Sequence, residues 1–269
     1  MEFIMAISKI RLAALVAIVL LGASGCGPLT DSRKAGEIPV HLSGVNDSVC
    51  PMTMSVSNRD WQINYLGVYV SNPEVRIDGR WQALNFQKND WQTKKVALLK
   101  FHGMCEETPE GNTRLLLDAS EKLMKLATNL RFTIGLPFEQ NHANPLSQPS
   151  PLNDSSMFWS WQAGHKFIRL DLTNPDTQHN FSYHLGSIGC ESDAPVRPPE
   201  KACAFTNRVE MILPMTQLDT ELDLSLSVST MVAQVALPQT EGCKFDPPSE
   251  GVCKQLLHNL LHRPWLDWE

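Results

Sequence analysis

The feature that most constrains the fold is a regular alternation of side-chain types over positions 218–228. Successive side chains of a β-strand point to opposite faces of the sheet, whereas helical side chains share a face every three or four residues. An alternation of this length therefore predicts a strand with one buried face and one face in water. The residues expected on the buried face are Leu218, Thr220, Leu222, Leu224, Leu226 and Val228.

Short alternating or apolar runs of the same kind recur along most of the chain. Asp78-Gly79 is a favourable turn dipeptide and predicts a hairpin between positions 75–77 and 81–84. Helical patterns are few: Ser120 can cap a helix with Leu123, Leu126 and Ala127 on one side, and positions 253–262 carry a stripe of leucines. This balance predicts a mainly β fold, a β-sandwich with long irregular loops and a few short helices.

The first 25 residues have the pattern of a secretory signal peptide. A short basic start is followed by an apolar run at positions 12–21, which is too short to span a bilayer. The run ends in small residues before Cys26, as in a lipobox, so Cys26 is expected to become the lipidated N-terminus. Positions 26–37 then form a tether and positions 38–269 a single domain. We expect a lipoprotein in the periplasm, anchored in the outer membrane by several acyl chains. The alternative is ordinary secretion with cleavage nearby.

Six cysteines remain once Cys26 is assigned to lipidation. An even number in an oxidising compartment predicts three disulfides that staple the domain, although fifteen pairings are open. Local pairing favours closure of the two short loops near the C-terminal end, which leaves the two most N-terminal cysteines for each other. A thiolate metal site is the alternative, but no C-x-x-C pair occurs. The expected pairs are Cys190–Cys203, Cys243–Cys253 and Cys50–Cys105.

The motifs of common enzymes are absent from the sequence. It has no G-x-S-x-G elbow, no glycine-rich phosphate loop and no H-E-x-x-H pair. The formal charge is −6 and the basic residues form no stripe, which argues against nucleic acid as a partner. We therefore predict no catalytic residue; an extracellular hydrolase is possible but has no motif to support it.

A proline-rich stretch at positions 136–164 differs from the rest because it shows little alternation and contains Trp159 and Trp161. Long ordered loops in compact domains are often functional. His142 lies in this loop, His165 directly follows it, and His184 lies on a predicted strand. Neutral imidazole is the commonest metal ligand in proteins, although any one of these histidines is more simply a surface or hydrogen-bonded residue.

Several segments together resemble the MbnP family, the metallo-mystery pair proteins with a four-cysteine motif. The resemblance covers roughly positions 38–260. It is carried by RFTIGLPF (131–138), NH (141–142), SPLN (150–153), MFWSWQ (157–162), GHKF (164–167), RLD (169–171) and FSYHLGSIGC (181–190), with YVSNP (69–73) and VALL (96–99) upstream.

The resemblance implies a periplasmic copper-binding protein that takes part in copper homeostasis. It also implies a partner, a MauG/MbnH-like di-haem cytochrome c peroxidase, which converts a tryptophan of this chain to kynurenine. Trp159 and Trp161 are the candidates for that modification, and His142, His184 and His165 are the candidate copper ligands. His165 stands where many relatives carry Tyr. The alternative is a surface module without metal, in which exposed aromatic rings stack on a ligand.

Overall fold

The computed structural model describes residues 33–101, 110–194, 196–215, 223–247 and 250–269. The predicted signal peptide, lipidated Cys26 and most of the tether lie outside these residues, as does Cys105. Within the described residues no helix is both long and apolar enough to cross a membrane.

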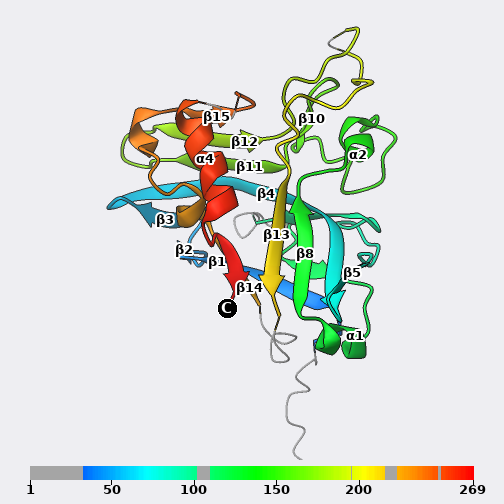
Figure 1. Cartoon of the computed structure of the whole chain (residues 1–269). Helices are drawn as coiled ribbons and strands as arrows, with labels where there is room; N and C mark the ends of the chain where they lie inside the picture. The colour runs from blue at the N-terminus through cyan, green and yellow to red at the C-terminus, as the bar shows by residue number, and fades with distance from the viewer. Residues whose placement is uncertain (1–32, 102–109, 195, 216–222, 248–249) are drawn as a thin grey trace, which may run out of the picture. The chain divides into compact units, whose positions relative to one another are not determined.

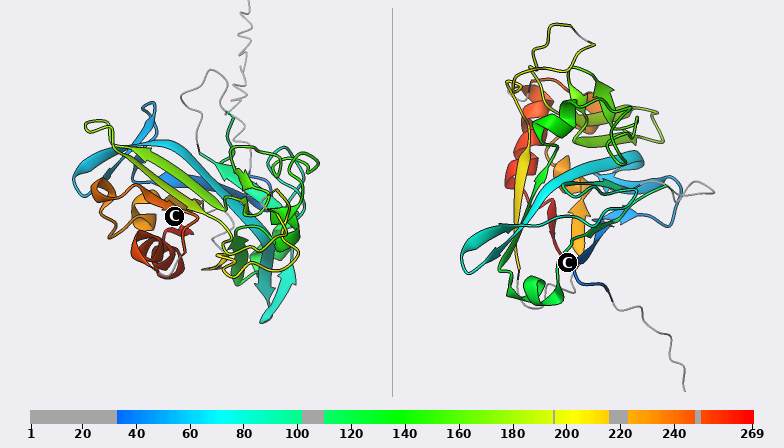
Figure 2. Two further views of the ribbon diagram at one scale, coloured as in Figure 1. Left: turned by 90° about the horizontal axis from the view of Figure 1, so that it is seen from above. Right: turned by 90° about the vertical axis from the view of Figure 1, so that its right-hand side faces the viewer.

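The larger sheet has ten strands arranged around one long strand, β4, which pairs with β3, β5, β6, β8 and β11 (Figures 1 and 2). Its main path runs β13-β8-β4-β11-β12-β15, and β2 is added through β3. The sheet is mixed because β15 runs parallel to β12. Its strands are β2 (Val45–Asn46), β3 (Met52–Val56), β4 (Arg59–Ile77), β5 (Arg80–Ala83), β6 (Val96–Lys100), β8 (Asn129–Ile134), β11 (Ile168–Thr173), β12 (Asn180–Leu185), β13 (Val209–Pro214) and β15 (Gly242–Lys244).

A second sheet has the order β16-β14-β1-β7, with β1 and β14 parallel. It comprises β1 (Glu37–Ser43), β7 (Arg114–Leu116), β14 (Leu224–Ser227) and β16 (Leu266–Trp268). Val40 and Leu224 from this sheet share one hydrophobic core with Val68 and Leu170 from the larger sheet. The prediction of a mainly β, sandwich-like fold is confirmed, with sheets that do not close into a barrel.

The helices are α1 (Glu121–Leu126), α2 (Phe138–His142), α3 (Val228–Met231) and α4 (Gly251–His262), with a 3-10 turn at Leu237–Gln239. Ser120 caps α1 as predicted, accepting a hydrogen bond from the backbone of Leu123. The predicted apolar side was wrong at Leu126, which is 55% exposed. Ala127 is buried as predicted and Leu123 packs against the core, while Met124 takes the buried position that was expected for Leu126.

Part of the predicted strand at positions 218–228, namely Leu218, Thr220 and Leu222, lies outside the described residues. Leu224 and Leu226 are buried on β14, as predicted. The prediction was wrong at Val228, where α3 begins, because the Ser227 side chain accepts a hydrogen bond from Thr230 and caps a helix. Val228 is nevertheless fully buried, so burial alone did not identify the element.

The predicted hairpin turn is confirmed. Asp78 and Gly79 both have positive φ, 50° and 76°, between the paired residues Ile77 and Arg80. Two consecutive residues of this conformation match the twist of the flanking strands. The predicted β4–β5 hairpin is therefore set by two residues of local sequence.

Two predicted disulfides are present, Cys190–Cys203 and Cys243–Cys253. Cys50 is also disulfide-bonded, but its predicted pairing with Cys105 involves a residue outside the described ones and stays a prediction. The Cys243–Cys253 bridge ties β15 to α4. It is therefore the covalent attachment of the C-terminal helix to the larger sheet.

Removing this bridge with Cys243→Ala/Cys253→Ala is expected to lower the free energy of unfolding. The bridge closes a loop with a sequence separation of 10, for which the loss of chain entropy on cross-linking corresponds to about 3 kcal/mol. Urea unfolding followed by tryptophan fluorescence measures the change. A loss below about 1 kcal/mol would contradict the assignment of the bridge as a stabilising staple.

Candidate functional site

The proline-rich loop folds into three short elements that set up the candidate site. They are α2, the strand β9 (Phe158–Ser160) and the strand β10 (Gly164–His165), which pairs with β9. Because strand side chains alternate, Trp159 points to the opposite side from Phe158. Phe158 packs edge-on against His165, whereas Trp159 packs against His184. The loop thus presents its two faces to two different histidines.

Trp159 is the centre of a cluster on the outer face. It is 46% exposed, and its ring stacks on Phe245 with 4.9 Å between ring centroids. The His184 ring meets it edge-on at 5.9 Å, and the Lys166 Nζ lies 5.3 Å from its ring centroid. A large aromatic ring that is fixed by neighbours on several sides and still reaches solvent is accessible to a partner protein.

Lys166 also fixes the backbone of this loop. Its Nζ donates to the carbonyl oxygens of Ser156 and Phe158, at 3.0 and 3.3 Å. Burial, together with the nearby charge of Arg169, lowers the pKa of Lys166 to about 8. The ammonium group therefore holds β9 in place beneath Trp159.

His184 is held by a carboxylate from the neighbouring strand. It lies opposite Arg169 in the β11–β12 pair, and its Nε2 is 2.8 Å from Asp171 Oδ1. Burial raises the pKa of Asp171, but the hydrogen bond with His184 and the guanidinium of Arg169 outweigh burial and lower it. Asp171 is therefore ionised at neutral pH.

An ionised Asp171 can only accept a hydrogen bond, so the Nε2 of His184 carries the proton. In the neutral form of the ring, the Nδ1 of His184 then has a free lone pair. This atom is buried and has no hydrogen-bond partner among the described residues. A carboxylate–histidine pair with the other nitrogen free is the arrangement that orients metal-binding histidines.

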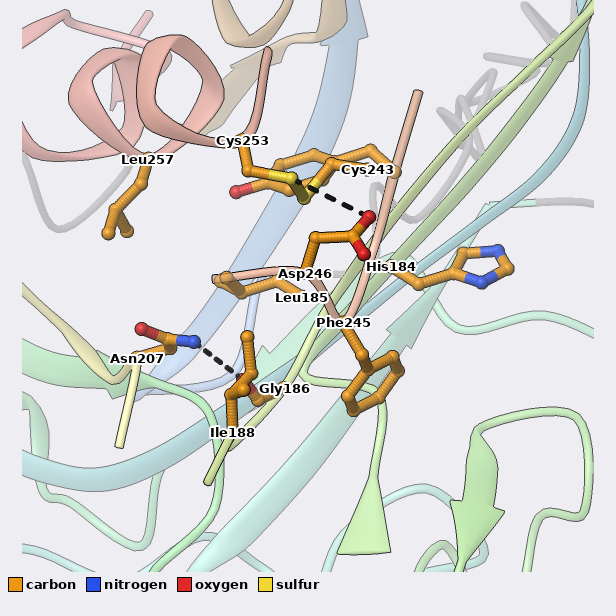
Figure 3. A pocket seen from close by; sticks show the side chains of 11 residues that line it. His184, Leu185, Gly186, Ile188, Asn207, Cys243, Phe245, Asp246, Cys253 and Leu257 are labelled. Carbon is orange, nitrogen blue, oxygen red and sulfur yellow. Dashed lines mark hydrogen bonds between the residues drawn. A yellow bond between two sulfur atoms is a disulfide. The ribbon is translucent and has the colours of Figure 1, made fainter. Parts of the chain in front are cut away.

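Figure 3 shows the surroundings of His184 on the side of α4. Its imidazole points away from the Cys243–Cys253 disulfide, and Phe245 lies nearby. Phe245 also borders an open hollow of about 250 Å³ that is lined in addition by Gln162 and Cys190. The hollow therefore borders the ring on which Trp159 stacks.

His142 has a different environment at the end of α2. It is buried, and its Nε2 lies 3.4 Å from the Sγ of Cys203, which is bonded to Cys190. The Oδ1 of Asn141 accepts a hydrogen bond from the His165 backbone N–H, so the Nδ2 of Asn141 must be the atom that donates to His142 Nε2 at 3.1 Å. The remaining proton of a neutral His142 is then on Nδ1.

The protonation of His142 follows from its burial. Desolvation, with a smaller effect of His165, lowers its pKa to about 4. The ring is neutral at pH 7, and its Nδ1–H has no acceptor among the described residues. Unlike His184, His142 offers no free lone pair in this hydrogen-bond arrangement.

His165 is fully buried on β10. Its Nδ1 is 3.0 Å from the carbonyl oxygen of Asn141 and its Nε2 is 2.9 Å from that of Leu152. Both nitrogens therefore face a carbonyl oxygen. Gly164 allows this close packing, because its φ is +79° and a Cβ there would lie 2.5 Å from Asn141 Oδ1.

The structure thus brings Trp159 together with His184, and Trp161 together with Phe158 at 6.0 Å between ring centroids. It does not place the three candidate histidines in one ligand set. Among the described residues, the groups of three or more potential His, Cys, Asp or Glu ligands each contain the two sulfurs of a disulfide: His142 with Cys190 and Cys203, and Asp246 with Cys243 and Cys253. Disulfide sulfurs are not thiolate ligands.

Sequence reasoning missed the role of Asp171 and Phe245. The signal for Asp171 was present, because pairing positions 168–173 with 180–185 as a hairpin places Asp171 and His184 on neighbouring strands. No local pattern marks Phe245, which reaches Trp159 only through the parallel pairing of β15 with β12.

Comparison with known proteins gives one family and one solved structure. A family model described as MbnP matches residues 37–245. The fold is similar to that of MbnP from Methylosinus trichosporium, with a TM-score of 0.65 and 21% sequence identity over 84% of this chain and 86% of that one. No curated protein sequence matches the chain.

Proposed function

Since the chain belongs to the MbnP family, we propose that it is a periplasmic copper-binding lipoprotein whose copper site is built around His184 and Trp159. Family membership supports an involvement in the methanobactin and copper system in general. The anchor at Cys26, the metal and the partner are parts of the proposal. Its role is binding and delivery of copper, and the chain itself performs no turnover.

One observation carries the proposal: a buried histidine nitrogen without a partner, oriented by a carboxylate, beside an exposed indole. His184 Nδ1 supplies one ligand, and Asp171 fixes its tautomer. Imidazole binds copper well. An indole N–H can only donate a hydrogen bond, so Trp159 in its unmodified form adds no ligand.

Oxidation of Trp159 to kynurenine would give this side chain atoms that can bind a metal. A MauG/MbnH-like di-haem peroxidase uses two molecules of hydrogen peroxide. One oxygen atom of each peroxide is added to the indole as its C2–C3 bond opens, and the other leaves as water. Hydrolysis of the N-formyl product releases formate and leaves an aryl amine and a ketone. The amine nitrogen and ketone oxygen are then available beside His184 as further donors.

Trp159 is favoured over Trp161 as the oxidised residue because it is exposed and adjacent to His184. Incubation with the di-haem peroxidase and peroxide, followed by peptide mass spectrometry, is expected to give the kynurenine mass gain at Trp159. Trp161→Phe should be modified to the same extent as the unaltered protein, and Trp159→Phe should yield no kynurenine. Modification confined to Trp161 would contradict the assignment.

A surface module that binds by stacking is the second candidate function. The exposed Trp159 ring on Phe245 is a two-ring platform of the kind that holds a planar ligand. The two functions differ in their need for His184. A stacking module keeps its ligand affinity in His184→Gln, whereas copper binding at this site does not survive that change.

A further inference from the structure

Helix α4 carries two histidines outside the site described above. His258 and His262 are both exposed and lie four residues apart, with their ring centroids 4.6 Å from each other. Neither ring has a hydrogen bond or ion pair within the described part of the chain. Side chains at this spacing share one face of a helix, so the nitrogens of both rings can reach one ligand.

The helix that presents this pair is firmly held. Its opposite face is buried through Leu256 and Leu260, and Cys253 joins it to β15 by a disulfide. Asn259, which follows His258 in the sequence, is fully buried. Its side-chain amide donates to the carbonyl oxygens of Met231 and Ala233 at 2.9 and 2.7 Å. Such a helix is preorganised, so a ligand that joins the two rings does not have to order the backbone.

We propose that His258 and His262 form a second metal site, a two-imidazole chelate for a divalent transition-metal ion. Imidazole suits copper, nickel and zinc, and the order of stability among first-row divalent ions favours Cu²⁺. The pair lies in the last turns of α4, where the unpaired carbonyl groups carry partial negative charge and favour a cation. Water or a donor from another protein completes the coordination.

This site is independent of the proposed function at Trp159. Helix α4 begins at Gly251, beyond the segment that the family model matches. The chelate therefore adds a surface site to the chain, one that takes a hydrated divalent ion without any modified residue. Loss of either site leaves the ligands of the other intact.

The test is a titration with Cu²⁺ and with Zn²⁺ in a His184→Gln background, so that only the α4 site is measured. Calorimetry gives the affinity, and electron paramagnetic resonance of the Cu²⁺ form reports nitrogen coordination. His258→Gln and His262→Gln are each expected to lower the affinity by roughly tenfold or more, because the second imidazole binds intramolecularly. Both positions are exposed, and far-ultraviolet circular dichroism should confirm that the variants keep their fold.

A rescue variant tests the spacing itself. Lys254 is exposed and four residues before His258. Lys254→His/His262→Gln therefore recreates a pair one turn earlier and should recover most of the lost affinity. Unchanged binding in His258→Gln/His262→Gln would overturn the proposal, and so would a rescue variant that binds no better than His262→Gln.

Discussion

Replacing His184 with glutamine is expected to lower the affinity for copper by more than tenfold once Trp159 has been oxidised. The substitution removes the imidazole nitrogen that is buried and without a hydrogen-bond partner at this site. Asp171→Asn keeps the ring but removes the charge that orients it. Loss of such an outer partner typically costs about 10–100-fold in metal affinity.

The measurement is a competition titration against a copper chelator. It is best made in a His258→Gln/His262→Gln background, so that the helix site does not contribute. His41→Gln is a matched control, because His41 is an exposed ring that already pairs with a carboxylate, Asp223. If His184→Gln binds copper as tightly as His41→Gln, the copper site lies elsewhere.

The second large effect is a loss of stability in mild acid that depends on His142. In the folded protein its pKa is about 4, whereas an exposed histidine titrates near 6.5. Between these values the unfolded chain binds more protons than the folded one, so stability falls as the pH drops from about 6.5 to about 4. A group with this difference contributes about 3 kcal/mol to the fall.

Two other titratable groups, His165 and Asp171, also affect how the stability of the fold depends on pH. The pKa of His165 is also lowered, mainly by burial. His165 therefore adds to the loss of stability as the pH falls below the ordinary histidine pKa. Asp171 has a lowered pKa as well, but a carboxylate works in a different window. Its stabilising contribution is present above the ordinary pKa of about 3.9 and is lost only as the pH falls below that value through the folded pKa.

His142→Gln is expected to flatten the profile between pH 6.5 and 4, because glutamine can still accept the hydrogen bond from Asn141 but binds no proton. Urea unfolding at a series of pH values, compared with His41→Gln, gives the slopes. An equal slope in the two variants would show that His142 is not protonated on unfolding.

Local chemistry explains which parts of the fold were predictable. The Asp78-Gly79 turn, the Ser120 cap and the Cys190–Cys203 and Cys243–Cys253 bridges each depend on residues close in sequence, and each was predicted. The leucine stripe of α4 was found for the same reason. Val228 was misassigned because a buried valine is compatible with a strand and with the start of a helix, and the Ser227 cap decides between them.

The candidate site depends on contacts that no local pattern contains. His184 and Trp159 were identified as candidates, but the sequence could not show that they meet, or that His165 is enclosed by carbonyl groups. His142 and His184 were indistinguishable in the sequence. They differ because one has its Nε2 beside an amide that donates and the other beside a carboxylate that accepts.

The way the Trp159 cluster is assembled would set the order of folding and of the oxidation proposed for Trp159. The ring is bordered by His184 from β12 and by Phe245, which directly follows β15 and lies two residues after Cys243. These neighbours come together only when the sheet has formed and the chain around Cys243 is in place. The oxidising partner proposed above would therefore meet this arrangement only on a chain that has finished folding, and the proposed modification would serve the cell as a mark of completed assembly.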